Sequence, residues 1–160
     1  WVVLVGGLTL YMQARTVAAP AAAWHAQEAS GAYALEVTPS FSAEPDPFAL
    51  DTDAGGASAL RVRLNGDDVL VLTETVEAGR PQRVESLTGV VIGSNEFYVE
   101  ANPPLEFGDR ASAVRIRLFQ GDAPLADETL WSEAGMRLAS TFTVNVTARE
   151  DATEDDSHGH

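Results

Sequence analysis

Residues 59–79 read ALRVRLNGDDVLVLTETVEAG, and residues 113–135 return to the same pattern with AVRIRLFQGDAPLADETLWSEAG. Arg61 and Arg115 are 54 positions apart, and the two Glu-Ala-Gly triplets are 56 positions apart. Each stretch opens with apolar residues that alternate with arginines, which is the period of a strand with one buried face. A turn signal and a second run follow in both copies, so the sequence predicts two related hairpins and an internal duplication.

The alternation also divides the side chains of the two copies between core and surface. We expect the arginines to point outward and the apolar positions to point into the core, namely Leu60, Val62, Leu64, Val114, Ile116 and Leu118. Glu74 and Glu128 keep the offset of 54 positions. We expect them to pair across strands with the outward arginines, at roughly 0.2–1 kcal/mol each. The alternative at this stage is a face of paired arginines that binds carboxylates or an acidic partner.

Further strand-like runs surround the two copies, at residues 33–38, 83–92, 96–101 and 137–148. About eight short strands separated by frequent turn signals predict an all-β fold, an antiparallel sandwich that is immunoglobulin-like in the loose sense. The cysteine–tryptophan–cysteine signature of true immunoglobulin domains is missing, because the chain has no cysteine. We assign the sandwich to residues 31–149.

The first twelve residues, WVVLVGGLTLYM, form an apolar run, and the first charge is at Arg15. The run supplies about half of the roughly 20 apolar residues that cross a bilayer. We expect residues 1–15 to be the C-terminal part of a membrane-anchoring, transmembrane helix, followed by an alanine-rich linker over residues 16–30. Two alternatives stay open, a buried β-strand or core segment and the remnant of a signal peptide.

An anchored subunit would present apolar and aromatic side chains to its neighbours in the membrane and at the sandwich surface. Trp24 lies at the end of the linker, and Phe107 follows an aromatic and proline-rich stretch that is either a contact loop or a plug for one end of the sandwich. We expect the partner-contact residues to be Trp1, Val5, Leu8, Tyr11, Trp24 and Phe107.

The formal net charge of −14 limits the classes of partner. Nucleic acid needs a basic footprint, so it is excluded as a partner, and electrostatic docking on anionic lipid is disfavoured. Solubility is the simplest role of such a charge, and a basic protein or a cation is the partner that it would favour. All ten basic residues are arginine, and with the abundant alanine, glycine and aspartate this composition indicates a GC-rich bacterial genome.

Two places carry weak metal-binding signals. Asp51 and Asp53 suggest a calcium loop, but the spacing that follows lacks the side-chain ligands of an EF-hand. An irregular calcium site would add Glu44 and Asp46. His158 and His160 end an acidic tail over residues 150–160, where imidazole and carboxylate ligands lack a second shell that would fix their geometry. We expect no cofactor.

The chain does not look like an enzyme. Its three histidines lie outside the predicted sandwich, and a phosphate-binding loop would need a lysine that the sequence does not contain. Glu96 and Glu100 share one face of a strand about 13 Å apart, which is too far for a retaining glycosidase pair.

We therefore expect a non-catalytic accessory or structural subunit of a larger bacterial membrane protein complex of respiratory or photosynthetic type. The reasoning is by analogy with such assemblies, whose subunits often contribute contact area. The partners would be other subunits and the lipid bilayer, with a single-pass helix in the inner membrane and the sandwich in the periplasm. The alternative is a free-standing cell-envelope binding module for a basic protein, a ligand or Ca²⁺.

Overall fold

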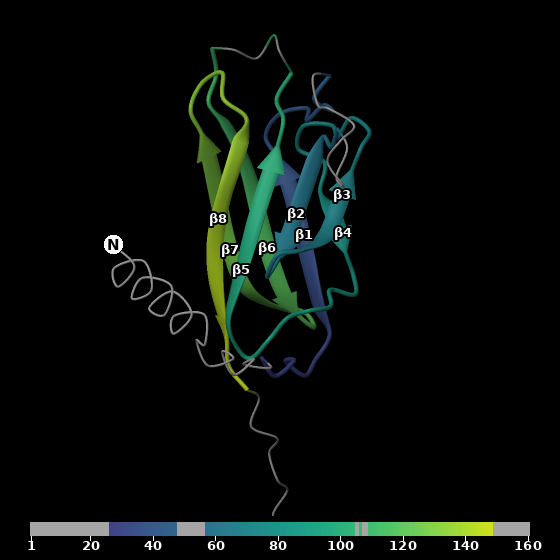
Figure 1. Cartoon of the computed structure of the whole chain (residues 1–160), viewed down its shortest axis with the longest axis vertical. Coiled ribbons are helices and arrows are strands. Elements are labelled where there is room, and N and C mark those ends of the chain that lie inside the picture. The colour runs from purple at the N-terminus through teal and green to yellow at the C-terminus, as the bar shows by residue number, and fades with distance from the viewer. Residues whose placement is uncertain (1–25, 48–56, 105, 107–108, 149–160) are drawn as a thin grey trace, which may run out of the picture.

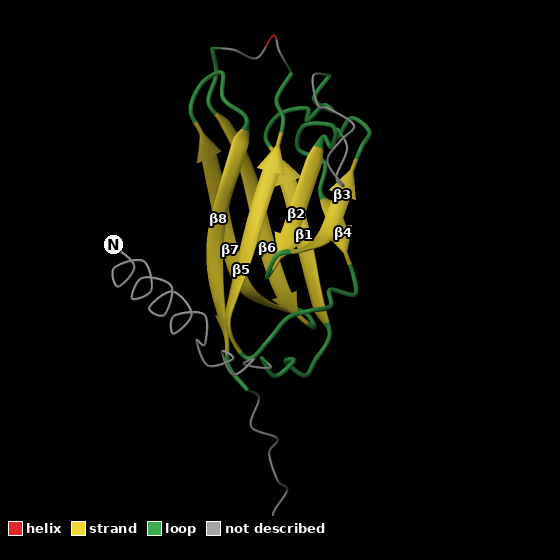
Figure 2. Ribbon diagram, in the orientation of Figure 1, coloured by secondary structure: helices red, strands yellow, loops and turns green. Residues whose placement is uncertain are grey.

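A computed structural model describes residues 26–47, 57–104, 106 and 109–148 of the chain. The regular elements are eight strands, with the bounds β1 (Tyr33–Pro39), β2 (Leu60–Leu64), β3 (Asp67–Leu72), β4 (Gln82–Val84), β5 (Gly93–Ala101), β6 (Ser112–Gln120), β7 (Ala123–Ser132) and β8 (Leu138–Val146). The prediction of an all-β antiparallel fold is confirmed (Figure 2). None of the described segments forms a helix with the length and apolar character that a bilayer crossing requires.

The strands form two four-stranded sheets that pack face to face (Figure 1). The first sheet has the order β4-β1-β6-β7 and the second has the order β3-β2-β5-β8. Every strand pair is antiparallel. The inner faces of both sheets supply one apolar core, in which the largest fully buried side chains include Phe41, Phe97, Leu35 and Leu138. The six apolar positions that the alternation assigned to the core are all buried.

The chain takes the same path twice. Replacing β1, β2, β3 and β4 by β5, β6, β7 and β8, and the reverse, converts the strand order of the first sheet into that of the second. The registers agree with this equivalence, because Val37 lies opposite Ile116 in the first sheet and Val99 lies opposite Val62 in the second. Each half therefore gives two strands to each sheet, and neither half builds a sheet of its own.

Backbone geometry explains why the Glu-Ala-Gly triplet occurs in both copies. Gly79 and Gly135 have φ of 74° and 76°, a left-handed conformation that glycine adopts without strain. In each copy the residue after the glycine donates its amide to the carbonyl of the triplet's glutamate, at 3.2 Å in the first and 3.1 Å in the second. Both triplets are thus tight turns with glycine at the third position, which is why the same three letters recur.

The expected equivalence of Glu74 and Glu128, which lie beyond the hairpin turns of the two copies, is wrong. Glu128 lies opposite Ile116, whereas the residue opposite the equivalent Val62 is Leu70 and not Glu74. The second hairpin extends two residues farther on each arm than the first, so the offset between the copies grows by four positions across the turn. The expected pairing of Glu74 and Glu128 with outward arginines is therefore a misreading of a repeat whose arms differ in length.

The last part of the expected linker belongs to the sandwich. Glu28 forms an isolated antiparallel bridge with Val91, and the carbonyl of Gln27 accepts the amide of Ile92 at 2.8 Å. These contacts tie residues 27–29 to the segment that leads into β5. The expected helix over residues 1–15 and the acidic tail over residues 150–160 lie outside the part of the chain that the structure describes.

The two ends of the sandwich carry different connections (Figure 1), and residues 85–92, between β4 and β5, lie at the end of the hairpin turns, where Leu87 donates its amide to the carbonyl of Tyr33. Residues 26 and 148 lie at one end together with the two-residue turns of the β2–β3 and β6–β7 hairpins. At the opposite end lie the connections that follow β1, β3, β5 and β7. We call this opposite end the loop end, and its described residues are 40–47, 57–59, 73–81, 102–104, 106, 109–111 and 133–137.

Candidate binding surfaces

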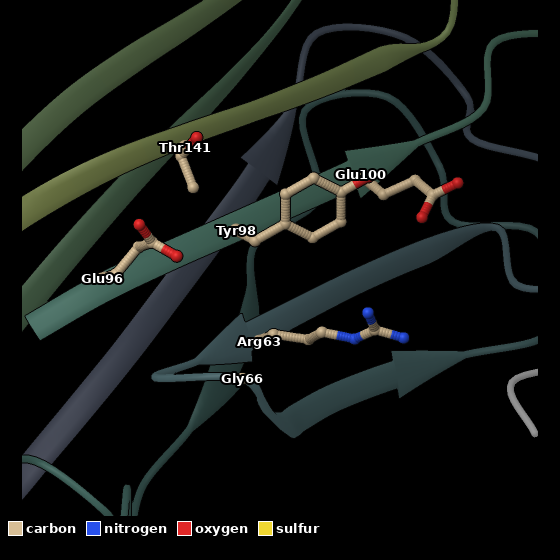
Figure 3. Close-up of a pocket in the computed structure, with 6 residues that line it drawn as sticks. All are labelled: Arg63, Gly66, Glu96, Tyr98, Glu100 and Thr141. Atoms are coloured by element: carbon tan, nitrogen blue, oxygen red, sulfur yellow. The ribbon is translucent and has the colours of Figure 1, made fainter. Parts of the chain in front are cut away.

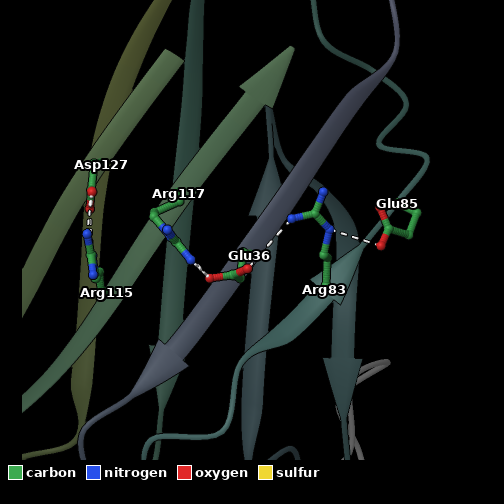
Figure 4. A network of polar contacts seen from close by, with 6 residues as sticks. All are labelled: Glu36, Arg83, Glu85, Arg115, Arg117 and Asp127. Atoms are coloured by element: carbon green, nitrogen blue, oxygen red, sulfur yellow. Dashed lines mark hydrogen bonds and ion pairs between the residues drawn. The ribbon is translucent and has the colours of Figure 1, made fainter. Parts of the chain in front are cut away.

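The outward face of the first sheet carries a row of alternating charge (Figure 4). Arg83, Glu36, Arg117 and Asp127 are direct cross-strand neighbours on β4, β1, β6 and β7, and we call these four the charge row. Arg117 forms an ion pair with Glu36, and a guanidinium nitrogen of Arg83 lies 3.6 Å from the second oxygen of the same carboxylate. Glu36 therefore bridges two arginines, while its own side chain is only 12% exposed.

The remaining charges of this face are also compensated. Arg115 donates two hydrogen bonds to the carboxylate of Asp127, at 2.7 and 2.5 Å. This pairing lowers the pKa of Asp127 and raises the pKa of Arg115 from their ordinary values. Arg83 and Arg117 also lie over the ring of Phe119, 5.0 and 5.4 Å from its centroid, within cation–π range. The face thus satisfies its own charges and offers little to a ligand.

The outward face of the second sheet is hollowed instead (Figure 3). The hollow has a volume of about 280 Å³ and is lined by Arg63, Gly66, Glu96, Tyr98, Glu100 and Thr141. Glu96, Tyr98 and Glu100 project from β5, between Arg63 on β2 and Thr141 on β8. The parity of β5 confirms that both glutamates share the outer face, since Phe97 and Val99 are buried between them.

Most charges around the hollow have internal partners. The Nε of Arg63 donates to Asp68 at 2.9 Å, and this hydrogen bond raises the pKa of Arg63. Glu100 accepts a hydrogen bond of 2.8 Å from Arg137, in the connection before β8. Glu96 is exposed, and its carboxylate forms no ion pair with any described residue. Within the described part of the chain, the hollow therefore presents the carboxylate of Glu96 without an ion-pair partner, next to the ring of Tyr98.

A second hollow of about 440 Å³ runs along the edges of β3 and β4. It is lined by residues 71–77 and 80–82, and the ion pair of Arg80 with Glu77 lies in it at 3.6 Å. Neither hollow contains a histidine, so neither brings together a nucleophile and an imidazole base.

Two large apolar side chains are strongly exposed near the loop end. Trp131, near the end of β7, is 69% exposed, and Met136, in the turn that follows, is 60% exposed. Trp131 shares the outward parity of Asp127 and lies opposite the small Ala113, so no large neighbour covers the indole from that position. Such a tryptophan is typical of interaction sites, where it supplies a large apolar area and one hydrogen-bond donor.

The site residues expected from the sequence are not the ones that form these surfaces. The expected partner contacts and metal ligands all lie outside the described part of the chain, namely Trp1, Val5, Leu8, Tyr11, Trp24 and Phe107 for contacts, and Asp51, Asp53, His158 and His160 for metal. Among the described residues, which include Glu44 and Asp46, no group of three or more potential metal ligands comes together. In the sequence, Trp131 has the same parity as Asp127, so the strand period indicates that it faces outward.

No protein family, no curated protein and no solved structure matches this chain. The chemistry open to it follows from its own residues. The first sheet is closed by internal ion pairs, the second sheet has a hollow with a spare carboxylate, and the loop end exposes a tryptophan and a methionine.

Proposed function

We propose that the chain is a non-catalytic accessory subunit of a larger bacterial membrane complex of respiratory or photosynthetic type. It contacts its neighbours through the loop end of the sandwich. The observation that carries this proposal is the exposure of Trp131 and Met136, at 69% and 60%. Buried tryptophan anchors supply a large share of binding energy in protein interfaces, and methionine adapts its shape to a partner.

The rest of the proposal places the sandwich relative to a membrane. Residues 1–15 form the anchoring helix in the inner membrane, and the immunoglobulin-like sandwich lies in the periplasm after the linker. The uncharged apolar run over residues 1–12 supports this placement. Because the described chain enters and leaves at the end opposite the loops, the loop end would stand roughly 30 Å farther from the membrane, the length of nine strand residues.

The proposal includes an origin of the sandwich by tandem duplication of a four-stranded unit. Three features of the described chain support it. The strand order repeats after four strands, the registers of the central pairs are equivalent, and the same Glu-Ala-Gly turn closes β3 and β7. In such a repeated fold many charged side chains form internal ion pairs. This arrangement fits a protein that contacts its neighbours better than it fits a catalyst.

The test is co-purification from detergent-solubilised membranes of the native host. The double variant Trp131→Ala/Met136→Ala should lose the neighbours that the wild-type chain retains. The matched control is Val71→Ala/Leu125→Ala, which also removes two exposed apolar side chains, each 40% exposed and outside the proposed contact at Trp131 and Met136. A wild-type chain that always migrates alone as a monomer, or equal retention by both double variants, would contradict the proposal.

A second candidate function is a free-standing cell-envelope binding module for a basic protein, a ligand or Ca²⁺. The hollow beside Glu96 favours it, since that carboxylate has no ion-pair partner among the described residues. The calcium version predicts a higher melting temperature of the full chain in the presence of Ca²⁺. Calorimetry with and without the ion decides, and an unchanged melting temperature counts against calcium.

A further inference from the structure

We propose that the hollow of the second sheet receives a lysine side chain of a basic partner protein, with its ammonium between the carboxylate of Glu96 and the ring of Tyr98. The inference deepens the second candidate function and rests on it. The geometry around the hollow supplies three independent reasons: a broken internal repeat, a fixed backbone and a matching charge.

The first reason comes from comparing the two sheets. In the second sheet the places of the charge row are taken by Thr141, Tyr98, Arg63 and Asp68, which are direct cross-strand neighbours on β8, β5, β2 and β3. The arginine and aspartate at one side are kept. Tyr98 stands at the position of the bridging Glu36, and Thr141 stands at the position of Arg83. The second sheet therefore has no continuous row of ion pairs across its four strands.

The carboxylates of the second sheet lie instead on either side of Tyr98, at Glu96 and Glu100. Their equivalents on β1 are Ala34 and Thr38, which carry no charge. Glu100 is held by Arg137 at 2.8 Å. Glu96 has no ion pair within the described residues, and it is this carboxylate that a partner's cation would satisfy.

The second reason is that the position of Glu96 is fixed by its backbone. The side-chain oxygen of Asn65 accepts the amide of Glu96 at 2.9 Å, and the amide of Asn65 donates to the carbonyl of Glu96 at 2.8 Å. Gly66 follows in the same turn with φ of 96°, and a Cβ there would meet no atom within 4 Å. The turn thus holds the backbone of Glu96 in place and leaves open space at Gly66, so the backbone need not rearrange when a side chain enters.

The third reason is chemical. An ammonium group can donate to the Glu96 carboxylate and to the hydroxyl of Thr141 while it contacts the face of the Tyr98 ring. Of the arginines beside the hollow, Arg63 is engaged by Asp68 and Arg137 by Glu100, so their repulsion of an incoming charge is reduced. The net charge of −14 draws basic partners toward the surface and speeds their encounter.

The experiment is a residue-resolved NMR titration of the full chain with N-acetyl-lysine N′-methylamide. The matched neutral probe is the norleucine analogue, which has a methyl group in place of the ammonium. We expect saturable shifts concentrated at Tyr98, Thr141 and Gly66 with the lysine probe, and none of comparable size with norleucine. Separate fitting of each resonance distinguishes the hollow from the acidic residues elsewhere in the chain.

Variants sharpen the test. Glu96→Gln keeps the backbone contacts with Asn65 and should weaken the binding seen at Tyr98 by about two- to fivefold, the range for one exposed charge pair. Glu74→Gln makes the same change of net charge away from the hollow and should leave that binding unchanged. Tyr98→Leu removes the ring and should also weaken the lysine shifts at Thr141. An amide spectrum that matches the wild type outside the hollow confirms that each variant is folded.

Equal weakening by Glu96→Gln and Glu74→Gln would overturn the inference, because the lysine would then respond only to total charge. Shifts spread evenly over the acidic surface would overturn it as well. The result is separable from the accessory-subunit proposal, which depends on Trp131 and Met136 and is measured by co-purification. Saturable lysine binding with unchanged co-purification, or the reverse, shows which of the two fails.

Discussion

Glu36 is the central charge on the outer face of the first sheet, because its largely buried carboxylate pairs with two arginines on neighbouring strands. Replacement by glutamine keeps the shape but removes the anion that lies between Arg83 and Arg117. We expect Glu36→Gln to lower the free energy of unfolding by about 1–3 kcal/mol, the cost of removing one partner from buried charged hydrogen bonds. Urea denaturation followed by circular dichroism measures the change.

The control for that substitution is a second glutamate that pairs with Arg83. Glu85 also accepts a hydrogen bond from Arg83, at 2.9 Å, but its side chain is 72% exposed. Solvent screens such a pair, so Glu85→Gln should change the free energy of unfolding by less than about 0.5 kcal/mol. Equal losses for the two variants would show that Glu36 has no special bridging role.

Asp127 gives the sandwich a pH dependence of known sign. The hydrogen bonds from Arg115 hold the pKa of Asp127 below its ordinary value of 3.8. A carboxylate with a depressed pKa in the folded state stabilises the fold fully above the unfolded value, and this contribution is lost as the pH falls through the folded value. The free energy of unfolding should therefore differ between wild type and Asp127→Asn near neutral pH and converge below about pH 3.8.

The measurement is urea denaturation of both proteins across that pH range. Arg115→Gln removes the same pair from the other side and should show the same convergence. A difference between wild type and Asp127→Asn that stays constant down to the lowest pH would mean that the aspartate is no better stabilised in the folded state than in the unfolded chain.

At the scale of elements, β7 is the longest strand and lies at the edge of the first sheet. Glu128 lies opposite the buried Ile116, so it is on the core side of the strand, yet it is exposed because the edge is open. Charges placed inward on an edge strand prevent a second sheet from adding to it. We expect Glu128→Val to self-associate, with a rise in apparent mass by light scattering at high protein concentration.

Thr129→Val is the matched control for the edge. It makes a similar gain in apolar character on the same strand, but on the outward side, where Thr129 lies opposite Arg115. That variant should remain monomeric to the same concentration as the wild type. If both valine variants associate equally, added hydrophobicity and not the loss of an inward charge is responsible.

The elements also show how far the sequence could be interpreted. The alternation around Arg61 and Arg115 predicted two hairpins, their buried faces and their turns, since these depend on local period and on glycine. The pairing of Glu74 and Glu128 could not be predicted in the same way, because the arms of the two hairpins differ in length and only the register reveals it. A repeated sequence motif identifies structurally equivalent residues only up to the first point at which the two copies differ in length.

The candidate surfaces were harder to predict than the strands. Glu96 and Glu100 were correctly placed on one face of a strand, but the hollow depends on Gly66 and Thr141, which come from a turn and from another strand. No local pattern connects those positions. The absence of a bridging glutamate at Tyr98 becomes meaningful only after the two sheets are superimposed strand by strand.

At the scale of the whole molecule, the two halves depend on each other. β1 has β6 of the other half as its long neighbour, and β2 has β5. A fragment of residues 26–92 keeps only the β1–β4 and β2–β3 pairs, and two-stranded pairs are marginal in water. We expect the fragment to be unfolded as a monomer by circular dichroism, and to regain β structure when residues 93–148 are added.

A chromatographic measurement of mass accompanies the spectra. Because β2 is the equivalent of β6, a second copy of the first half could supply the missing neighbour, so any folded form of the fragment alone should be a dimer. A stable folded monomer of residues 26–92 would contradict the view that the core needs strands from both halves.

The unequal connections have a final consequence. Twenty residues join β1 to β2, whereas ten join the equivalent β5 to β6, and yet the central strand pairs of the two halves keep equivalent registers. A doubling of connection length has therefore been absorbed without disturbing the framework. The loop end can therefore accept insertions and deletions in its connections without loss of strand register, whereas both hairpins at the other end keep turns of two residues.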